Sequence, residues 1–140
     1  MKLELRSFEK AINSLEELLK ETENKEFMES LNLIVYNGLI AGVIQNFEFT
    51  YELAWKYMKR WLENNIGNSE VDGVSRRQLF RLAMENKLIE DVDTWMEFHI
   101  ARNRTSHTYD FDTAEKVYEV SKEFLVEVKK LYKEIEAKNE

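Results

Sequence analysis

A chain of 140 residues with 44% apolar and 12% aromatic residues can build a genuine hydrophobic core, and one globular domain is expected. It has no proline, four glycines and no cysteine, which favours long helices and excludes disulfide frameworks and thiolate zinc sites. The net charge of −7 argues against a broad basic surface for nucleic acid, so any RNA contact must be local. We therefore expect an all-α fold.

The segments to consider as targeting or membrane segments are the first residues and the longest apolar run. The first residues alternate charged with apolar side chains, and the longest apolar run, residues 39–44, is interrupted by glycine. The sequence thus predicts neither a signal peptide nor a membrane span. Together with the absence of cysteine, this favours a cytoplasmic protein.

Two helices are predicted in the first half of the chain. Residues 3–22 form the first, because apolar side chains recur there at helical spacing, at Phe8, Ile12, Leu15 and Leu19. Residues 23–31 are polar and aperiodic. A longer helix is expected to begin between residues 33 and 39 and to end near residues 64–65, before Gly67. Its middle is apolar over more than one face, which predicts the central helix of a bundle.

Capping patterns predict the helices of the second half. Ser75 followed by Gln78 begins a third helix that runs to about residue 86, and Asp91 or Asp93 caps a fourth from residue 94.

The last helix is predicted to begin at Asp112, which forms a capping pattern with Glu115. Its buried stripe would consist of Val117, Val120, Phe124, Val128, Leu131 and Ile135. The expected architecture is an antiparallel bundle of four main helices plus a short one.

The strongest candidates for functional residues lie in one run, Arg102-Asn103-Arg104-Thr105-Ser106-His107-Thr108-Tyr109. Arginine offers a planar fork of donors that suits a phosphate, and histidine moves protons near neutral pH. Positions 102 and 107 are about 140° apart around a continuous helix, so they would not share a face. Either the helix ends or kinks between them, or the arginine of one subunit meets the histidine of another. Hydroxyl and carboxyl side chains at 105–110 favour a helix end.

The side chains of this run are suited to the cleavage of an RNA phosphodiester. Arg102 would hold the phosphate, His107 would move a proton, and no metal would be required. Asn103 could orient either group, and Tyr109 offers a ring on which a base could stack. The alternative is structural: Arg102 pairs with a carboxylate, His107 caps the helix and Tyr109 packs in the core.

Other polar residues are weaker candidates. His99 precedes Arg102 by one helical turn and could line the same cleft, as could Arg104 and Ser106, although such a histidine is more often a packing residue. The pair Asp91 and Asp93 resembles a magnesium motif but is better explained by helix capping. No Glu-x-x-His pair of a di-iron bundle is present, so no metal site is predicted.

Two carboxylates, Glu48 and Glu52, lie one turn apart on the apolar central helix. They are either surface charges, with Glu52 paired to Lys56, or part of a cleft or partner interface.

The pattern Arg, four residues, His, one residue, Tyr resembles the signature of the HEPN superfamily, in its HepT-like branch, also known as nucleotidyltransferase substrate-binding proteins. Residues 45–56 resemble the second-helix motif of the same family. Ser75-Arg76-Arg77, with Leu88-Ile89 and Trp95, occupies the intervening region, so the resemblance spans nearly the whole chain of residues 1–140 as one HEPN-type helical domain.

This resemblance implies a homodimer in which two Arg-to-His segments share a cleft. It implies a metal-independent ribonuclease without cofactor, with Arg102 and His107 catalytic and Asn103 assisting. It also implies a toxin–antitoxin pair in which an MntA-type nucleotidyltransferase silences the ribonuclease by adding AMP units to Tyr109. The alternatives are a non-catalytic subunit that presents a nucleotide or other substrate to the nucleotidyltransferase, and a helical assembly scaffold.

Overall fold

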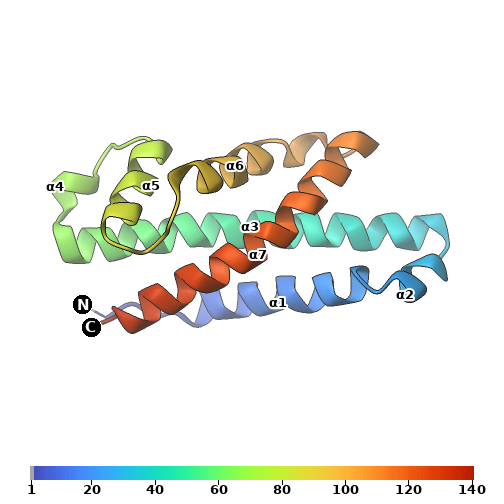
Figure 1. The fold of residues 1–140 in the computed structure, drawn as a ribbon, viewed down its shortest axis with the longest axis horizontal. Helices are drawn as coiled ribbons and strands as arrows, with labels where there is room; N and C mark the ends of the chain where they lie inside the picture. The colour runs from blue at the N-terminus through green and yellow to red at the C-terminus, as the bar shows by residue number, and fades with distance from the viewer. Residues whose placement is uncertain (1) are drawn as a thin grey trace.

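The computed structural model describes residues 2–140, and in this range every regular element is helical, which confirms the all-α prediction (Figure 1). In chain order the elements are α1 (Arg6–Thr22), α2 (Lys25–Glu29), α3 (Leu33–Ile66), α4 (Asn68–Val71), α5 (Arg76–Glu85), α6 (Val92–Asn103), the short 3₁₀ helix η1 (Thr105–His107) and α7 (Phe111–Ala137).

The 34-residue helix α3 runs the length of the molecule and is the central helix (Figure 1). Helices α1 and α6 run antiparallel to it, and α7 crosses diagonally over α3 and α1. The two termini lie together, where Leu3 and Asn139 exchange two hydrogen bonds of 2.8 and 2.9 Å. An antiparallel helical bundle is therefore confirmed.

Three helix ends follow the capping chemistry that the sequence predicts. The Ser75 hydroxyl accepts from the Gln78 N–H at 3.1 Å and begins α5. The Asp91 carboxylate accepts from the Thr94 N–H at 3.1 Å, which starts α6 at Val92, two residues earlier than expected. Hydrogen bonds from Thr94 also lower the pKa of Asp91. Helix α3 ends at Ile66, and the next residue, Gly67, has a φ of 100°, which favours glycine.

Helix α1 begins at Arg6 and not at residue 3, and three further elements differ from the predictions. The stretch 23–31 contains α2, which Asn24 caps by accepting from the Phe27 N–H at 3.1 Å; its one buried residue, Met28, gave no periodic signal. The still shorter α4 follows Gly67, and it too gave no periodic signal. Helix α7 begins at Phe111, so Asp112 already lies inside the helix, and the expected cap there is wrong. Asp110 occupies the cap position instead.

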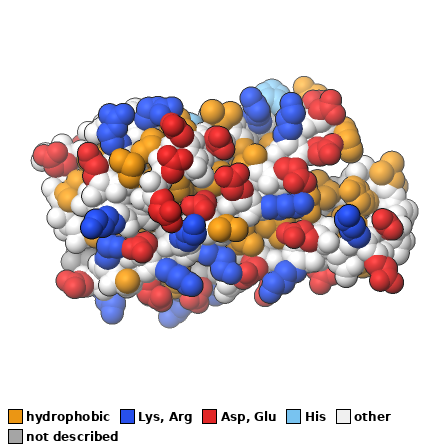
Figure 2. Space-filling view, viewed as in Figure 1, with side chains coloured by type: hydrophobic (Ala, Val, Ile, Leu, Met, Phe, Trp, Pro, Cys, Tyr) orange, Lys and Arg blue, Asp and Glu red, His pale blue; other side chains and the backbone are white. Residues whose placement is uncertain are grey.

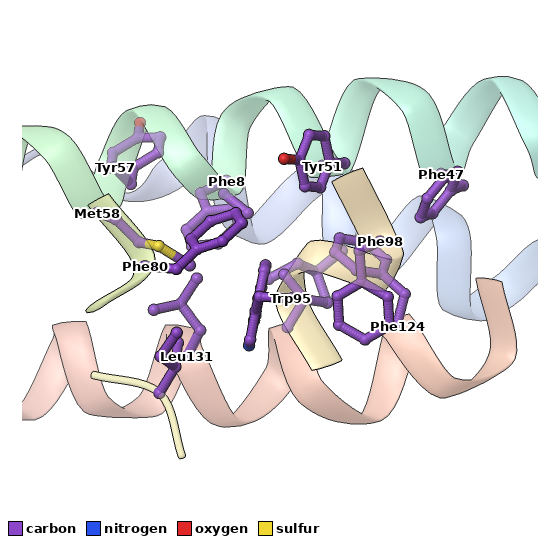
Figure 3. Packing of buried hydrophobic residues seen from close by; sticks show 14 of the residues in the cluster. Phe8, Phe47, Tyr51, Tyr57, Met58, Phe80, Trp95, Phe98, Phe124 and Leu131 are labelled. Carbon is purple, nitrogen blue, oxygen red and sulfur yellow. The ribbon is translucent and has the colours of Figure 1, made fainter. Parts of the chain in front are cut away.

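The core is centred on the fully buried Phe124 of α7 (Figure 3). Its ring meets Phe47 of α3 at 5.0 Å and Phe98 of α6 at 5.2 Å between centroids, both edge to face. Tyr51 and Trp95 complete the cluster at 6.3 and 5.8 Å. These aromatic contacts pack α3, α6 and α7 against one another. The signature begins at the end of α6, next to this cluster.

Candidate functional site

The predicted break in the helix lies between Arg102 and His107. Helix α6 ends at Asn103, and the chain continues into the 3₁₀ turn η1. The Thr105 hydroxyl reaches back to the Arg102 carbonyl oxygen at 2.8 Å, and the Thr108 hydroxyl donates to the Thr105 carbonyl oxygen at 3.1 Å. These hydroxyls satisfy carbonyls that a continuing helix would have paired, which explains why the helix stops here.

Arg102 is held by two carboxylates of α3. Its Nε lies 3.1 Å from Glu52 Oε1, and its Nη1 lies 3.5 Å from Glu48 Oε2. The Nη1 group also donates to the Thr105 hydroxyl at 3.3 Å, and the single hydrogen of that hydroxyl is shared between Glu48 and the Arg102 carbonyl oxygen. All three charged side chains are half-buried. The arrangement fixes the orientation of the guanidinium while part of it stays open to solvent.

Glu48 and Glu52 are functional candidates that the sequence left undecided. They lie one turn apart on α3, which places both on the face toward α6. Glu52 does not pair with Lys56; it accepts from Arg102 and from Trp55 Nε1, the latter at 3.0 Å. The available signal was the presence of two carboxylates on one face of an otherwise apolar helix.

A second network of polar side chains, which we call the polar chain, links α5 to α6 through Tyr51 of α3. Arg76 Nη1 donates to the Tyr51 hydroxyl at 3.1 Å, and that hydroxyl lies 2.9 Å from His99 Nδ1. His99 Nε2 lies 3.5 Å from Asn103 Nδ2. Tyr51 was not among the predicted site residues. The sequence clusters Arg76 with Arg77 and Arg81, and it predicts a small basic cleft if this cluster meets Arg102 and Arg104. His99 and Asn103 do meet as their helical spacing predicts.

The ionisation of this chain is set mainly by burial. Burial raises the pKa of Tyr51 to about 12, so the phenol keeps its proton and can donate it to His99. Burial, followed by the positive charge of Arg76 and, more weakly, that of Arg102, lowers the pKa of His99 and favours its neutral form. Both arginines therefore disfavour the charged form of the same histidine.

His107 and Tyr109 lie outside these networks and are exposed, Tyr109 at 87%. Their rings meet edge to face at 6.2 Å between centroids. Within the described chain neither side chain forms a hydrogen bond, so none joins His107 to Arg102. The purely structural alternative is therefore correct for Arg102, which pairs with carboxylates. It is wrong for the other two residues, because His107 does not cap a helix and Tyr109 is not in the core.

The remaining candidates, Arg104 and Ser106, are also exposed at the end of α6 and in η1. Figure 2 shows a histidine on the upper edge of the molecule beside two basic side chains, while acidic and basic groups are interspersed over the rest of this face. The positive charge of this face is therefore local, as the net charge predicts.

An apolar groove of about 460 Å³ adjoins Tyr109. It lies between the first turns of α3 and the start of α7, and its apolar lining includes Tyr36, Ile40, Phe111 and Tyr118. Several neighbouring apolar side chains are exposed, among them Leu33 at 72% and Ile34 at 85%. This surface, which we call the α3–α7 groove, ends at the signature.

Two further properties concern residues 2–140 as a whole. No cluster of three or more His, Asp or Glu side chains in this range has the arrangement needed to hold a metal ion. None of the helices in the same range combines the length and the apolar character needed to cross a bilayer. The predicted cytoplasmic location stays a prediction.

Comparison with known proteins gives consistent matches over nearly the whole chain. The family model described as nucleotidyltransferase substrate binding protein like matches residues 3–137. A Haemophilus influenzae protein named "Probable ribonuclease HepT" is 35% identical over 140 residues, which cover 99% of this chain and 96% of that protein.

Two solved structures share the fold. One, from Haemophilus influenzae, is described as the fold of a substrate binding domain of a nucleotidyltransferase; it has a TM-score of 0.92 and 34% identity, over 95% of this chain and 99% of that one. The other, from Thermus thermophilus, has a TM-score of 0.72 and 25% identity, over 91% and 98%. With the signature at the end of α6, these matches show that the chain belongs to the HepT-like family of nucleotidyltransferase substrate-binding proteins, within the HEPN superfamily.

Proposed function

We propose that this protein is a metal-independent endoribonuclease, acting as a single helical domain in a homodimer, and the toxin of a toxin–antitoxin pair. The observation that carries the proposal is the contrast between the two residues of the signature. Arg102 is oriented by Glu48 and Glu52, as a phosphate-binding group requires, whereas the His107 side chain is exposed and without a hydrogen bond in the described chain. The relative named as a ribonuclease supports the same activity.

The proposed reaction uses the 2′-hydroxyl of the RNA as the nucleophile. Its oxygen forms a bond to phosphorus while the bond from phosphorus to the 5′-oxygen breaks, which yields a 2′,3′-cyclic phosphate and a 5′-hydroxyl. Arg102 donates to the phosphate oxygens on which negative charge builds. A His107 imidazole takes the proton from the 2′-hydroxyl or returns one to the 5′-oxygen, and Asn103 orients the phosphate or the histidine.

A dimer would resolve the separation of Arg102 from His107 within one protomer. The α3–α7 groove and the exposed turns beside it offer an apolar surface that adjoins the signature. Burying this surface against a second copy would bring the two signatures together, so that the arginine of one subunit could serve the histidine of the other. His99, Arg104 and Ser106 would line the shared cleft.

The proposed partner is an MntA-type nucleotidyltransferase that adenylylates Tyr109. The exposure of this side chain supports the proposal, because its hydroxyl is free to react and removing it breaks no hydrogen bond of the described chain. A negatively charged nucleotide two residues from His107 would repel an RNA backbone and occupy the cleft. The family description, which refers to a nucleotidyltransferase, supports the same class of partner.

The test compares the wild type with Arg102→Ala and His107→Ala. Each protein is checked for its helical content, expressed alone in bacteria to measure growth, and assayed for RNA cleavage in EDTA. Arg81→Ala is the matched control, because Arg81 is an exposed arginine with no ion pair in the described chain. We expect the wild type and Arg81→Ala to stop growth and cut RNA, and the other two to do neither. If all four are inert and harmless, the protein is instead the substrate-binding subunit of a nucleotidyltransferase.

A further inference from the structure

Of the two half-buried arginines of the described chain, Arg102 has carboxylate partners and Arg76 has none. Arg77, the next residue, lies 3.2 Å from Asp93, and Arg102 is paired with Glu48 and Glu52. Arg76 forms no ion pair within the described chain. The protein has a net charge of −7 and therefore many carboxylates that could pair with an arginine. A guanidinium that none of them neutralises indicates a position where the anionic group of a ligand could bind.

The side chain of Arg76 is nevertheless fixed in place. Its guanidinium stacks on the indole ring of Trp55 at 3.7 Å from the ring centroid, and its Nη1 donates to the Tyr51 hydroxyl at 3.1 Å. The residue is half-buried, so the other donors of the fork are not all enclosed. Two independent contacts on α3 thus orient an arginine whose charge is left uncompensated, and such preorganisation lowers the entropic cost of binding an anion.

The position of Arg76 connects it to the signature. Tyr51 joins it to His99, which lies beside Asn103, and Trp55 joins it to Glu52, which holds Arg102. The positive charges of Arg76 and Arg102 both lower the pKa of His99. The two guanidiniums therefore flank one polar chain on the same side of the bundle.

We propose that Arg76 is a second phosphate-binding residue, which holds a phosphate of the RNA backbone next to the one bound by Arg102. The inference rests on the proposed ribonuclease function and extends its substrate site from the end of α6 to the start of α5. Arg76 binds through charge and takes no part in proton transfer, so it contributes to the affinity for RNA of any sequence. The stacking on Trp55 sets its direction.

The test measures RNA binding separately from cleavage. A fluorescent single-stranded oligonucleotide in which every ribose is 2′-O-methylated cannot undergo attack by a 2′-hydroxyl, and its affinity is measured by anisotropy over a series of salt concentrations. The proteins are the wild type, Arg76→Gln, Arg76→Lys and, as matched control, Arg77→Gln. Arg77 loses the same charge one residue away, where the side chain is exposed and paired with Asp93. Cleavage of unmodified RNA is assayed in parallel.

We expect Arg76→Gln to flatten the plot of log affinity against log salt by about 0.7 for each phosphate that is no longer neutralised, with Arg76→Lys and Arg77→Gln close to the wild-type slope. An unchanged slope in Arg76→Gln, while the wild type cuts RNA, would overturn this inference and leave the proposed function intact. The inference would also be overturned if Arg76→Gln kept the wild-type slope but no longer formed a dimer. That result would show that Arg76 pairs with a carboxylate of the second copy and not with RNA. A wild type that neither binds nor cuts RNA would overturn both proposals.

Discussion

Arg102 Nε lies 3.1 Å from Glu52 Oε1, so the arginine of the signature forms an ion pair with a carboxylate of the central helix. This contact has two opposed effects on a phosphate site. It holds the planar guanidinium in one orientation, which favours catalysis, and it places negative charge beside the position where a phosphate would bind, which weakens the affinity for RNA. The two effects can be separated by changing the charge of the carboxylate while keeping its shape.

The first prediction concerns Glu52→Gln. The amide keeps one acceptor for Arg102 but loses the charge, so the guanidinium should be oriented less firmly. We expect kcat for RNA cleavage to fall about tenfold, the equivalent of about 1.4 kcal/mol, while KM stays unchanged or falls. Steady-state kinetics on a defined oligonucleotide give both constants.

Glu63→Gln is the matched control for that prediction. Glu63 lies on the same helix, is half-buried, and forms no ion pair in the described chain. Its replacement should leave both constants unchanged. A rise in KM at constant kcat in Glu52→Gln would show that Glu52 contributes to binding rather than to the orientation of Arg102.

The second prediction concerns Tyr109→Phe. Because the tyrosine hydroxyl forms no hydrogen bond in the described chain, its removal should leave the melting temperature and RNA cleavage unchanged. Incubation with the nucleotidyltransferase and ATP should add AMP units to the wild type but none to this variant, as measured by intact-protein mass spectrometry. Tyr36→Phe, in the same groove, should be modified like the wild type. Modification of Tyr109→Phe would move the acceptor to another residue.

The third prediction concerns the core beneath the site. Phe124 is fully buried among four aromatic rings from α3 and α6, so Phe124→Ala should leave a cavity and lower the free energy of unfolding by about 3–5 kcal/mol. Phe49→Ala removes the same ring from a position that is 56% exposed, and should cost about 0.5 kcal/mol or less. Urea denaturation measures both. Equal losses would show that the packing around Phe124 does not hold the three helices together.

The long helices were predictable because their apolar residues have a regular period. Phe8, Ile12, Leu15 and Leu19 repeat on α1 and are all buried, as predicted. Helix α2 gave no such signal, because five residues are too few to show a period and only one of them is buried. Its identifiable feature was the cap, Asn24, whose side-chain oxygen accepts from the N–H three residues later.

The candidate site was predictable only in part, for a physical reason. The sequence placed Arg102, Asn103 and His99 on one helical face, because their spacing within α6 is local. Glu52, the partner of Arg102, lies 50 residues before it, and Arg76 lies 25 residues after its partner Tyr51, so both contacts depend on how α3, α5 and α6 pack. Periodicity along one helix contains no information about such contacts.

The last prediction is a pH dependence of stability. Burial lowers the pKa of His99 below its ordinary value of 6.5, and the charges of Arg76 and Arg102 act in the same direction while that of Glu52 opposes them. The folded state therefore favours the neutral ring, so this contribution to stability is present above pH 6.5 and is lost as the pH falls below it. We expect the urea midpoint of the wild type to fall more between about pH 7.5 and about pH 5.5 than that of His99→Gln, in which the amide oxygen can still accept from Tyr51. His107→Gln removes an exposed imidazole instead and should keep the wild-type pH dependence. An equal fall in the wild type and His99→Gln would show that His99 is not the group whose protonation opposes folding.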